Sequence, residues 1–198
     1  MSRTIKFHTA CFSTNLNNFS LTSIIKQYLL TADFSDMKDS EDNLIEFKNK
    51  IVLENEDEIL VHNTYYEISS FSESIQIFNK VECLIIFFDL EFNESLIELN
   101  KILKHIDVSS FSDKKIFVIK IYTNNNNIES NLDEESIKNC FSNYSLNNYE
   151  IVSTVNMDSS DELVEAIDKL TQIAIEEKIE SNDWKNIDNS NSFGCSII

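Results

Sequence analysis

The sequence contains a single glycine, Gly194, and no proline among its 198 residues. A backbone loop that wraps a phosphate group needs glycine where φ is positive or where the ligand comes close. Gly194 lies near the end of the chain, so glycine-dependent phosphate loops are excluded elsewhere. The G-x-S-x-G turn that carries the nucleophile of α/β-hydrolases is excluded for the same reason.

Basic residues are also scarce. The 16 Lys and Arg residues stand against 34 Asp and Glu residues, which gives a net charge of −18 at pH 7. Such a charge opposes direct binding to nucleic acid and to anionic lipid surfaces. No hydrophobic run reaches the roughly 18 residues of a membrane-spanning helix. The strongest run, Cys83 to Phe88, has the length of a strand.

The cysteines are few and scattered. Cys11, Cys83, Cys140 and Cys195 form no C-x-x-C pair, and none lies at a metal-ligand spacing from a histidine. We therefore expect no zinc site and no other cofactor. Because the first three cysteines have apolar neighbours, we expect free buried thiols and a reducing, intracellular compartment.

Apolar patterning predicts alternating strands and helices. Two stretches, Cys83 to Phe88 and Ile116 to Tyr122, are almost continuously apolar, as expected where both faces of a parallel strand are covered. In full, strands are predicted over residues 4–12, 44–53, 58–68, 83–88, 116–122 and 149–155, helices over 21–30, 93–106, 137–144 and 159–180, a loop over 31–43, and a short helix or turn over 72–79. Ser159 and Glu162 predict a capping box at the start of the last helix.

This order of elements predicts an α/β three-layer sandwich with a mostly parallel sheet. We expect one domain over residues 1–180 and a flexible tail over residues 181–198. The order of the predicted elements also resembles that of Ras-like small GTPases. It consists of one strand and helix, then two adjacent strands, then three strand–helix units.

The nucleotide-binding motifs of that fold are missing. Residues 12–20, after the first predicted strand, contain neither the glycines nor the lysine of a P-loop. The D-x-x-G position holds Glu67-Ile68-Ser69-Ser70, and the N-K-x-D position holds Thr123 followed by four asparagines, 124–127. Without the carboxylate, this loop cannot bind the N–H donors of guanine. We therefore expect a pseudo-GTPase that has no enzymatic activity.

Other catalytic candidates have simpler structural explanations. Asp89, at the tip of a central strand, lies where α/β folds place a phospho-acceptor or metal carboxylate. The first strand ends without an acidic partner, so we expect Asp89 to be solvated or to cap the next helix. His105 and Asp107 lie close together at a helix end, where a cationic histidine complements the helix dipole. We expect that role rather than a catalytic pair.

The segment from His105 to Lys114 resembles part of the centromere protein M family, a pseudo-GTPase family of the inner kinetochore. The matching residues are His105, Asp107, Ser109, Phe111 and Lys114, and the resemblance extends in pattern over roughly residues 81–175. It implies a non-enzymatic subunit of the nuclear centromere complex that binds helical partners such as centromere proteins I, H and K. It makes the five matching residues candidates for partner contact, although Phe111 would equally suit a core position.

Two alternatives remain open. Tyr65-Tyr66 and Trp184-Lys185-Asn186 resemble features of the alpha- and gamma-adaptin-binding pseudo-GTPase, which implies a cytoplasmic assembly chaperone for clathrin adaptors. The ending Cys195-Ser196-Ile197-Ile198 fits the C-a-a-X pattern. Cys195 is therefore a candidate prenylation site, and the third hypothesis is a prenylated Ras-like membrane protein that binds nucleotide unconventionally.

Overall fold

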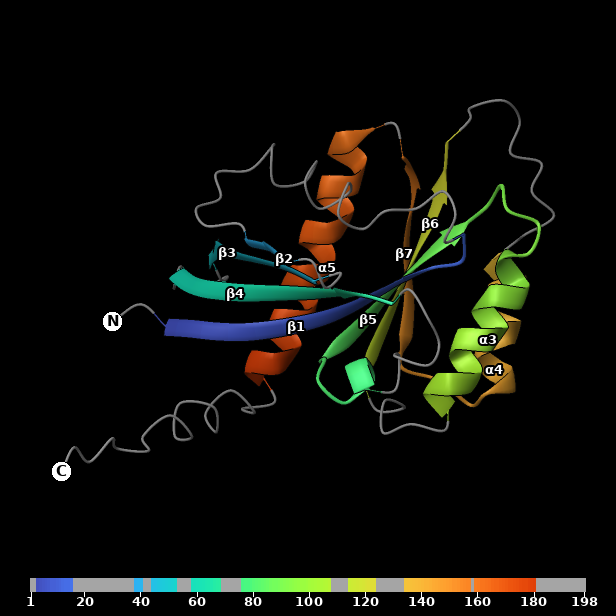
Figure 1. Cartoon of the computed structure of the whole chain (residues 1–198), viewed down its shortest axis with the longest axis horizontal. Coiled ribbons are helices and arrows are strands. Elements are labelled where there is room, and N and C mark those ends of the chain that lie inside the picture. The colour runs from blue at the N-terminus through green and yellow to red at the C-terminus, as the bar shows by residue number, and fades with distance from the viewer. Residues whose placement is uncertain are drawn as a thin grey trace.

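The structure is a computed structural model that describes residues 3–15, 38–40, 44–52, 58–68, 76–107, 114–123, 134–157 and 159–180. The strands are β1 (Arg3–Ser13), β2 (Lys38–Ser40), β3 (Leu44–Val52), β4 (Glu58–Glu67), β5 (Cys83–Asp89), β6 (Lys115–Tyr122) and β7 (Tyr149–Asn156). The helices are α3 (Ser95–Asp107), α4 (Glu134–Asn143) and α5 (Ser160–Glu180), and residues 76–78 are also helical. Figure 1 shows their arrangement.

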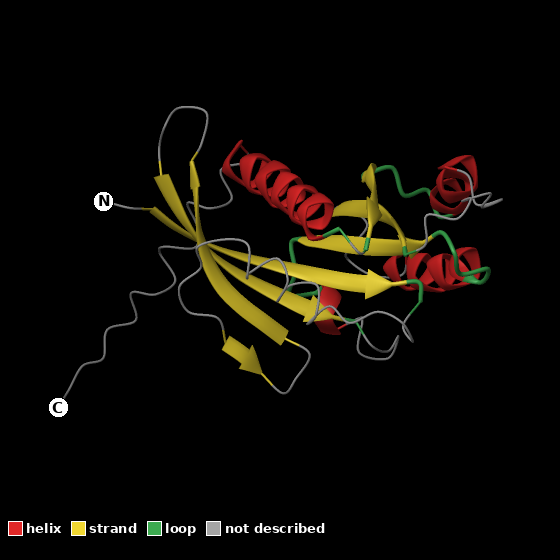
Figure 2. Ribbon diagram, turned by 90° about the horizontal axis from the view of Figure 1, so that it is seen from above, coloured by secondary structure: helices red, strands yellow, loops and turns green. Residues whose placement is uncertain are grey.

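The strands form one seven-stranded sheet in the order β2-β3-β4-β1-β5-β6-β7. β3 pairs antiparallel with both β2 and β4, whereas β1, β4, β5, β6 and β7 are joined by parallel pairings. Figure 2 shows how strongly the sheet twists between its two edges. The carboxyl ends of the parallel strands meet at one edge, because parallel neighbours run in the same direction.

Both faces of the sheet are covered, as the sequence predicts. Figure 1 shows α5 on one side of β5, β6 and β7, and α3 with α4 on the other. The buried residues of α5, including Leu163, Ile167 and Leu170, join one apolar cluster with the sheet. The buried residues of α3 and α4, including Leu99 and Ile137, join a second cluster on the opposite face.

Strand β5 explains why its sequence is continuously apolar. Cys83, Ile85 and Phe87 belong to the cluster beneath α5. The intervening Leu84, Ile86 and Phe88 belong to the cluster beneath α3 and α4. Successive side chains of a strand point to opposite faces, so a strand that is covered on both sides needs apolar residues throughout.

The predicted elements agree with the described residues except at one segment. The strands and helices over 83–88, 116–122, 149–155 and 137–144 are confirmed with small shifts of their ends. The loop predicted over 31–43 is wrong at Lys38–Ser40, which form β2 and pair with Leu44–Glu46. This edge strand is polar, and its backbone pairing leaves no apolar pattern to detect. The helix predicted over 21–30 and the tail over 181–198 lie outside the described residues.

Helix α5 begins directly after Ser159, as predicted, but with a different partner for Glu162. The Glu162 carboxylate accepts a hydrogen bond from the Asn156 backbone N–H at 2.9 Å. The N–H of Ser159 donates instead to the Asn156 carbonyl at 2.9 Å. The predicted capping box is therefore wrong in its geometry, because Glu162 ties α5 to the last residue of β7.

Candidate functional site

The carboxyl ends of β1 and β5 lie side by side at the point where the strand order reverses. From β1 the sheet continues to β4 and β3 on one side, and to β5, β6 and β7 on the other. Open α/β sheets bind their ligands outside the carboxyl ends of the strands at such a point. The polar side chains at this place come from the ends of β1, β5 and β6 and the start of α3, and they form the carboxyl-edge cluster: Ser13, Thr14, Asn15, Asp89, Glu91, Ser95 and Thr123.

Thr14 joins three elements within this cluster. Its N–H donates to the Phe87 carbonyl at 3.0 Å, and its hydroxyl oxygen accepts the N–H of Asp89 at 3.0 Å. The Ser95 hydroxyl donates to the Asp89 carbonyl at 2.6 Å. Because that bond uses the one hydroxyl proton of Ser95, Thr14 is the donor in the 2.9 Å contact between the two hydroxyls. Both side chains are buried, so these bonds fix the end of β1 against β5 and α3.

The carboxylate of Asp89 holds the ends of β1 and β5 together. Its Oδ2 accepts from the Asn15 side-chain amide at 2.8 Å, and its Oδ1 accepts from the Glu91 N–H at 2.8 Å. Asn15 is itself buried, and its N–H donates to the Ser13 hydroxyl at 3.1 Å. One carboxylate oxygen of Asp89 therefore links the ends of β1 and β5, and the other closes a turn to Glu91. Neither bond caps α3, so that expected role is wrong, whereas the partial exposure of Asp89 agrees with a solvated strand tip.

Glu91 extends the cluster to β6. Its Oε2 accepts hydrogen bonds from the N–H of Thr123 at 2.9 Å and from the Thr123 hydroxyl at 2.5 Å. The Leu90 N–H donates to the Ile121 carbonyl at 2.9 Å, so the backbone is tied at the same place. Thr123 is the first residue of the segment that takes the N-K-x-D position, and both of its donors are directed to Glu91.

Among the described residues at this edge, three backbone N–H groups donate to acceptors within the chain. A phosphate site offers free backbone N–H groups and a cationic side chain. Here the Asp89 N–H donates to the Thr14 hydroxyl, and the Glu91 N–H donates to the Asp89 carboxylate. The Thr123 N–H donates to the Glu91 carboxylate. The geometry suits a rigid junction of three strand ends. Sequence patterns did not single out Thr14, Asn15, Glu91 or Ser95, because polar residues after strands are common in any loop.

The residues predicted to contact a partner are only partly described. His105 lies partly buried in the last turn of α3, and Asp107 is the final residue of that helix. Ser109 and Phe111 lie outside the described residues, as does Cys195. Partner contact by these residues and prenylation of Cys195 therefore stay predictions.

Lys114, immediately before β6, fastens two segments of the chain together. Its ammonium group donates to the carbonyls of Phe78 at 2.8 Å and Val81 at 2.5 Å. Burial lowers the pKa of Lys114, while the nearby Glu82 carboxylate acts in the opposite direction. This side chain joins the segment before β5 to the start of β6, and its ammonium group is directed inward.

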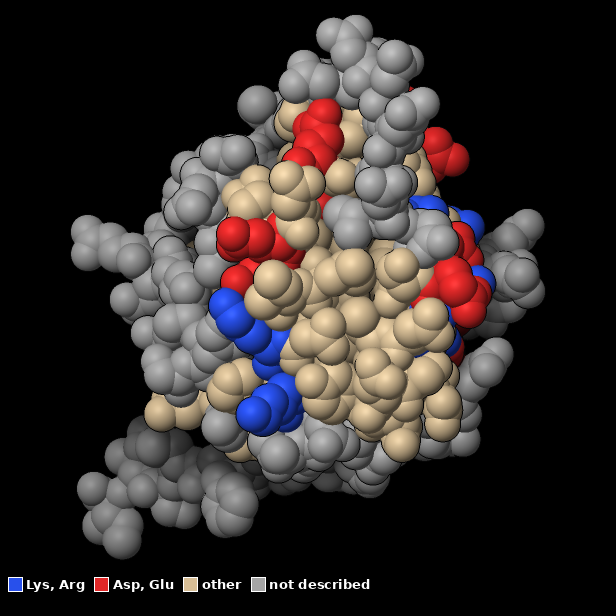
Figure 3. All heavy atoms as spheres, turned by 90° about the vertical axis from the view of Figure 1, so that its right-hand side faces the viewer, with Lys and Arg blue, Asp and Glu red and all other residues tan. Residues whose placement is uncertain are grey.

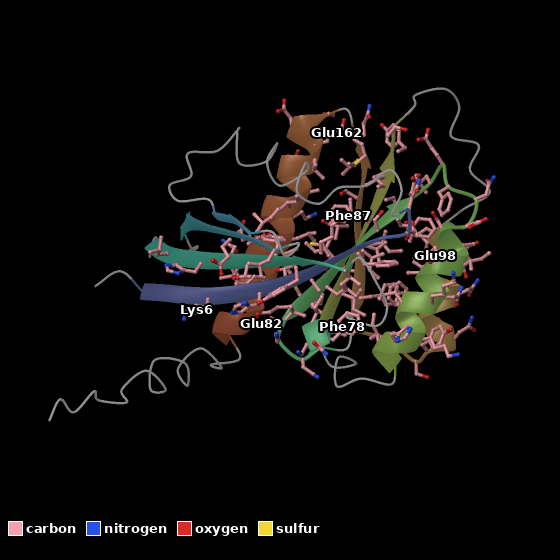
Figure 4. The ribbon with its side chains drawn as sticks, viewed as in Figure 1. Lys6, Phe78, Glu82, Phe87, Glu98 and Glu162 are labelled. Carbon is pink, nitrogen blue, oxygen red and sulfur yellow. The ribbon has the colours of Figure 1, made fainter. Side chains whose placement is uncertain are left out.

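Glu82 continues the pairing of β1 with β5 beyond the first residue of β5. Its N–H donates to the His8 carbonyl at 2.9 Å, and its carboxylate accepts the His8 N–H at 2.7 Å. Figure 4 shows Glu82 beside Phe78, at the end of the sheet opposite the carboxyl-edge cluster. The carboxylate takes the place of a strand carbonyl, so the His8 N–H is not left unpaired.

The adjacent tyrosines Tyr65 and Tyr66 face opposite sides of the sheet. Tyr65 is buried beneath α5, and its hydroxyl lies 3.2 Å from the Thr171 hydroxyl. Tyr66 packs against the cluster beneath α3 and α4. Burial raises the pKa of Tyr66, and the carboxylates of Glu46 and Glu82 raise it further.

The cysteines in the described ranges behave as predicted. Cys11, Cys83 and Cys140 are free and buried. Burial raises the pKa of the Cys11 thiol well above its usual value, with smaller contributions from Cys83 and Glu67. In the part of the chain that the structure describes, no group of three or more His, Cys, Asp or Glu side chains could hold a metal ion.

Within the described ranges, no helix has the length and hydropathy needed to cross a membrane. The chain matches no protein-family model and no curated protein.

Proposed function

We propose that this protein is a pseudo-GTPase platform that binds partner proteins instead of nucleotide. The observation that carries the proposal is the carboxyl-edge cluster. Its carboxylates, Asp89 and Glu91, accept the donors at the place where open α/β sheets bind ligands. A negatively charged phosphate group would have to displace these bonds and would meet two carboxylates there.

The arrangement of strands supports a Ras-like fold. The two adjacent strands β3 and β4 pair as an antiparallel hairpin beside β1. The later strand–helix units add β5, β6 and β7 in parallel on the other side. The predicted order of one strand, two adjacent strands and three strand–helix units would form this arrangement.

The partner class comes from the resemblance to the centromere protein M family. On that basis the protein is a subunit of the inner kinetochore in the nucleus, where it binds helical subunits such as centromere proteins I, H and K. The net charge of −18 is consistent with contact to chromatin through these partners rather than directly. Neither a cofactor nor an enzymatic activity is part of the proposal.

Affinity purification from dividing cells tests the partner class. The affinity tag is placed at the N-terminus so that Cys195 remains free, and the recovered proteins are identified by mass spectrometry. Recovery of centromere subunits is expected. Recovery of clathrin-adaptor subunits without centromere subunits would contradict the proposal and favour the adaptor-chaperone hypothesis.

Nucleotide binding tests the role of the carboxyl-edge cluster. The purified full chain is titrated with GTP and GDP in the presence of Mg²⁺ and followed by calorimetry. No binding is expected at nucleotide concentrations up to the millimolar range. Saturable binding, or GTP retained through purification, would contradict the pseudo-GTPase proposal and would favour the unconventional nucleotide-binding hypothesis.

A further inference from the structure

The last strand of the sheet, β7, has an open edge. Among the described residues, β7 pairs with β6 on one side and with no strand on its other side. Every residue of β7 except Val155 is half-buried or exposed, whereas Cys83 to Phe88 of β5 are all buried. The core of the protein is therefore less completely covered along β7 than at the centre of the sheet.

Hydrogen bonds at the two ends of β7 show which of its residues face the open edge. The Ile116 N–H donates to the Asn148 carbonyl at 3.0 Å, and the Met157 N–H donates to the Tyr122 carbonyl at 2.8 Å. In a parallel pair, a residue bonds to the two residues that flank its Cα partner, so that partner itself faces away. The residues of β7 whose backbone groups face away from β6 are Tyr149, Ile151 and Thr154, the Cα partners of Ile116, Val118 and Lys120.

Apolar side chains flank the open edge on both faces of the sheet. The ring of Tyr149 stacks on the ring of Phe141 in α4, with 4.1 Å between the ring centroids. The partly buried apolar side chains are Val152, Met157 and Ile173 on the α5 side, and Tyr144, Tyr149 and Ile151 on the α4 side. A further strand beside β7 would cover this apolar surface, as β5 and β6 are covered at the centre of the sheet.

β7 has few of the features that protect natural edge strands from pairing, such as lysines, prolines or a very short length. The chain contains no proline, and Glu150 is the charged residue of β7. Its carboxylate lies 3.8 Å from the Lys115 ammonium group of β6. The opposite edge of the sheet differs, because β2 has three residues and two of them, Lys38 and Asp39, are charged. β7 is therefore the edge that is better suited to accept another strand.

The two flanks of the open edge differ in charge. On the α4 side, Glu134 lies 2.7 Å from Lys138 and 3.5 Å from Lys120. Figure 3 shows acidic and basic residues side by side at the margin of the side where α3 and α4 lie. The exposed charged residues among the described side chains of α5, which packs on β7 and β6, are Asp161, Glu162, Glu165, Lys169 and Glu177. The α5 flank is therefore acidic, whereas the charges of the α4 flank are balanced.

We propose that the open edge of β7 binds an extended segment of a partner protein, which adds a strand to the sheet and presents aliphatic side chains to both flanks and basic side chains to α5. The free N–H and C=O groups of an edge match those of an extended chain, whereas a helix has bonded its own backbone groups internally. Aliphatic side chains suit the partly buried apolar residues, and basic ones complement the acidic flank.

Charge favours a different protein over a second copy of this chain. An isologous pairing of two β7 edges would keep α5 of both copies on the same face of the joined sheet. Two acidic helices would then come together in chains that each carry a net charge of −18. Self-pairing would therefore be opposed by repulsion, while a basic segment would be attracted.

The handedness of strand connections disfavours residues 181–198 as a parallel strand at this edge. α3 and α4 connect β5, β6 and β7 in one direction across the sheet, and α5 lies on the opposite face (Figure 1). A connection through α5 that continued in that direction would be left-handed, whereas about 98% of such crossovers are right-handed. The segment that follows α5 is therefore not the expected occupant.

Amide hydrogen exchange of the full chain, resolved by NMR, tests whether the edge is open. The amides of Ile151 and Thr154 should exchange at least about tenfold faster than those of Val155 and Met157, which face β6. Equal protection of the two sets would show that the chain itself covers the edge, and it would overturn the proposal.

Photo-crosslinking identifies the occupant of the edge. A benzoylphenylalanine replaces Thr154, which is exposed, and the full chain is irradiated in dividing cells. The control position is Glu46, which is exposed at the far side of the sheet. The crosslinked peptide should contain β-branched or aliphatic residues at alternate positions, Lys or Arg, and no proline. A crosslink to a second copy, to residues 181–198 or to an acidic segment, or no crosslink above the control, would overturn the proposal.

Two substitutions of Thr154 test the backbone pairing with a synthetic peptide of the crosslinked sequence. Thr154→Pro removes the N–H that faces the open edge, where a sheet tolerates proline, and it should raise the Kd of the peptide about tenfold. Thr154→Val keeps the N–H and should leave the Kd within about twofold of the wild type. Thermal melting confirms that both variants are folded. Wild-type affinity in the folded Thr154→Pro variant would contradict strand addition.

A charge reversal on α5 tests the basic character of the segment and leaves β7 unchanged. Lys169 is exposed and lies four residues before Ile173, so both residues are on the side of α5 that flanks the edge. Lys169→Glu should lower the Kd of the peptide about threefold, because it makes the flank more acidic. Lys104→Glu on α3 makes the same change at another exposed position and should have no effect. A higher Kd for Lys169→Glu would show that the segment is not basic.

This inference goes beyond the proposed function and can fail separately from it. If centromere subunits are recovered equally by the wild type and by folded Thr154→Pro, the β7 edge is not the binding surface and the proposed function stands. If a basic extended segment is crosslinked at position 154 but belongs to no centromere subunit, the edge is the binding surface and the proposed partner class is wrong.

Discussion

The carboxyl-edge cluster and the exposed side of α4 treat their polar groups in opposite ways. In the cluster, the buried side chains of Thr14, Asn15 and Ser95 are hydrogen-bonded within the chain. On α4, Asn139 and Asn143 are exposed to solvent. Buried polar groups that are fully paired stabilise one arrangement of the chain, whereas exposed uncharged groups remain available to a partner. The comparison teaches that the described polar groups at the carboxyl edge stabilise the fold.

The largest effect on stability is expected from Thr14→Val. The substitution keeps the shape of the side chain but removes the acceptor for the Asp89 N–H and the donor to Ser95. A buried group left unpaired costs about 1–3 kcal/mol, so the free energy of unfolding should fall by about 2–3 kcal/mol. Urea denaturation measures it, and Thr14→Ser, which keeps the hydroxyl, should lose less than half as much. Equal losses for Val and Ser would show that the methyl group and not the hydroxyl matters.

Asp89→Ala should lower the free energy of unfolding by a smaller amount, about 1–2 kcal/mol. The reason is that the Asn15 amide and the Glu91 N–H lose their acceptor at a partly exposed position. Hydrogen exchange should locate the loosening at the ends of β1 and β5. Partner recovery should stay at the wild-type level if the cluster serves only the fold. A selective loss of partner without a loss of stability would move the binding surface to the carboxyl edge.

On α4, Asn139→Glu should change the free energy of unfolding by no more than about 0.5 kcal/mol, because Asn139 is exposed, as for most exposed substitutions. Thermal melting of the purified variant measures this change. A stability loss as large as that of Thr14→Val would remove the contrast between the two regions.

The smallest effect concerns Lys114, whose pKa is lowered by burial in the folded protein. The folded state therefore binds this proton less tightly than the unfolded state, and the stability due to this ionisation rises as pH increases through the folded pKa towards the unfolded value. The stability of the wild type relative to Lys114→Met should accordingly increase with pH below about 10.5. Urea denaturation at several alkaline pH values checks this. A difference that decreases with pH would contradict the assigned cause.

Local patterns predicted the elements in which a few neighbouring residues decide the outcome. The apolar run of β5 and the spaced apolar residues of α5 each follow from burial on two faces or on one stripe. The polar β2 was missed because its formation depends on pairing with β3. The carboxyl-edge cluster was missed because Thr14 and Asp89 are 75 residues apart, and nothing local marks their contact.

The sequence by itself determined the alternation of strands and helices, the free buried thiols and the absence of a glycine-based phosphate loop. These properties depend on side-chain type and spacing, which the chain carries regardless of its partners in space. Only the tertiary structure decided from which donors the carboxylates of Asp89 and Glu91 accept hydrogen bonds. These bonds follow from packing the ends of three strands together, which brings distant residues within hydrogen-bond distance.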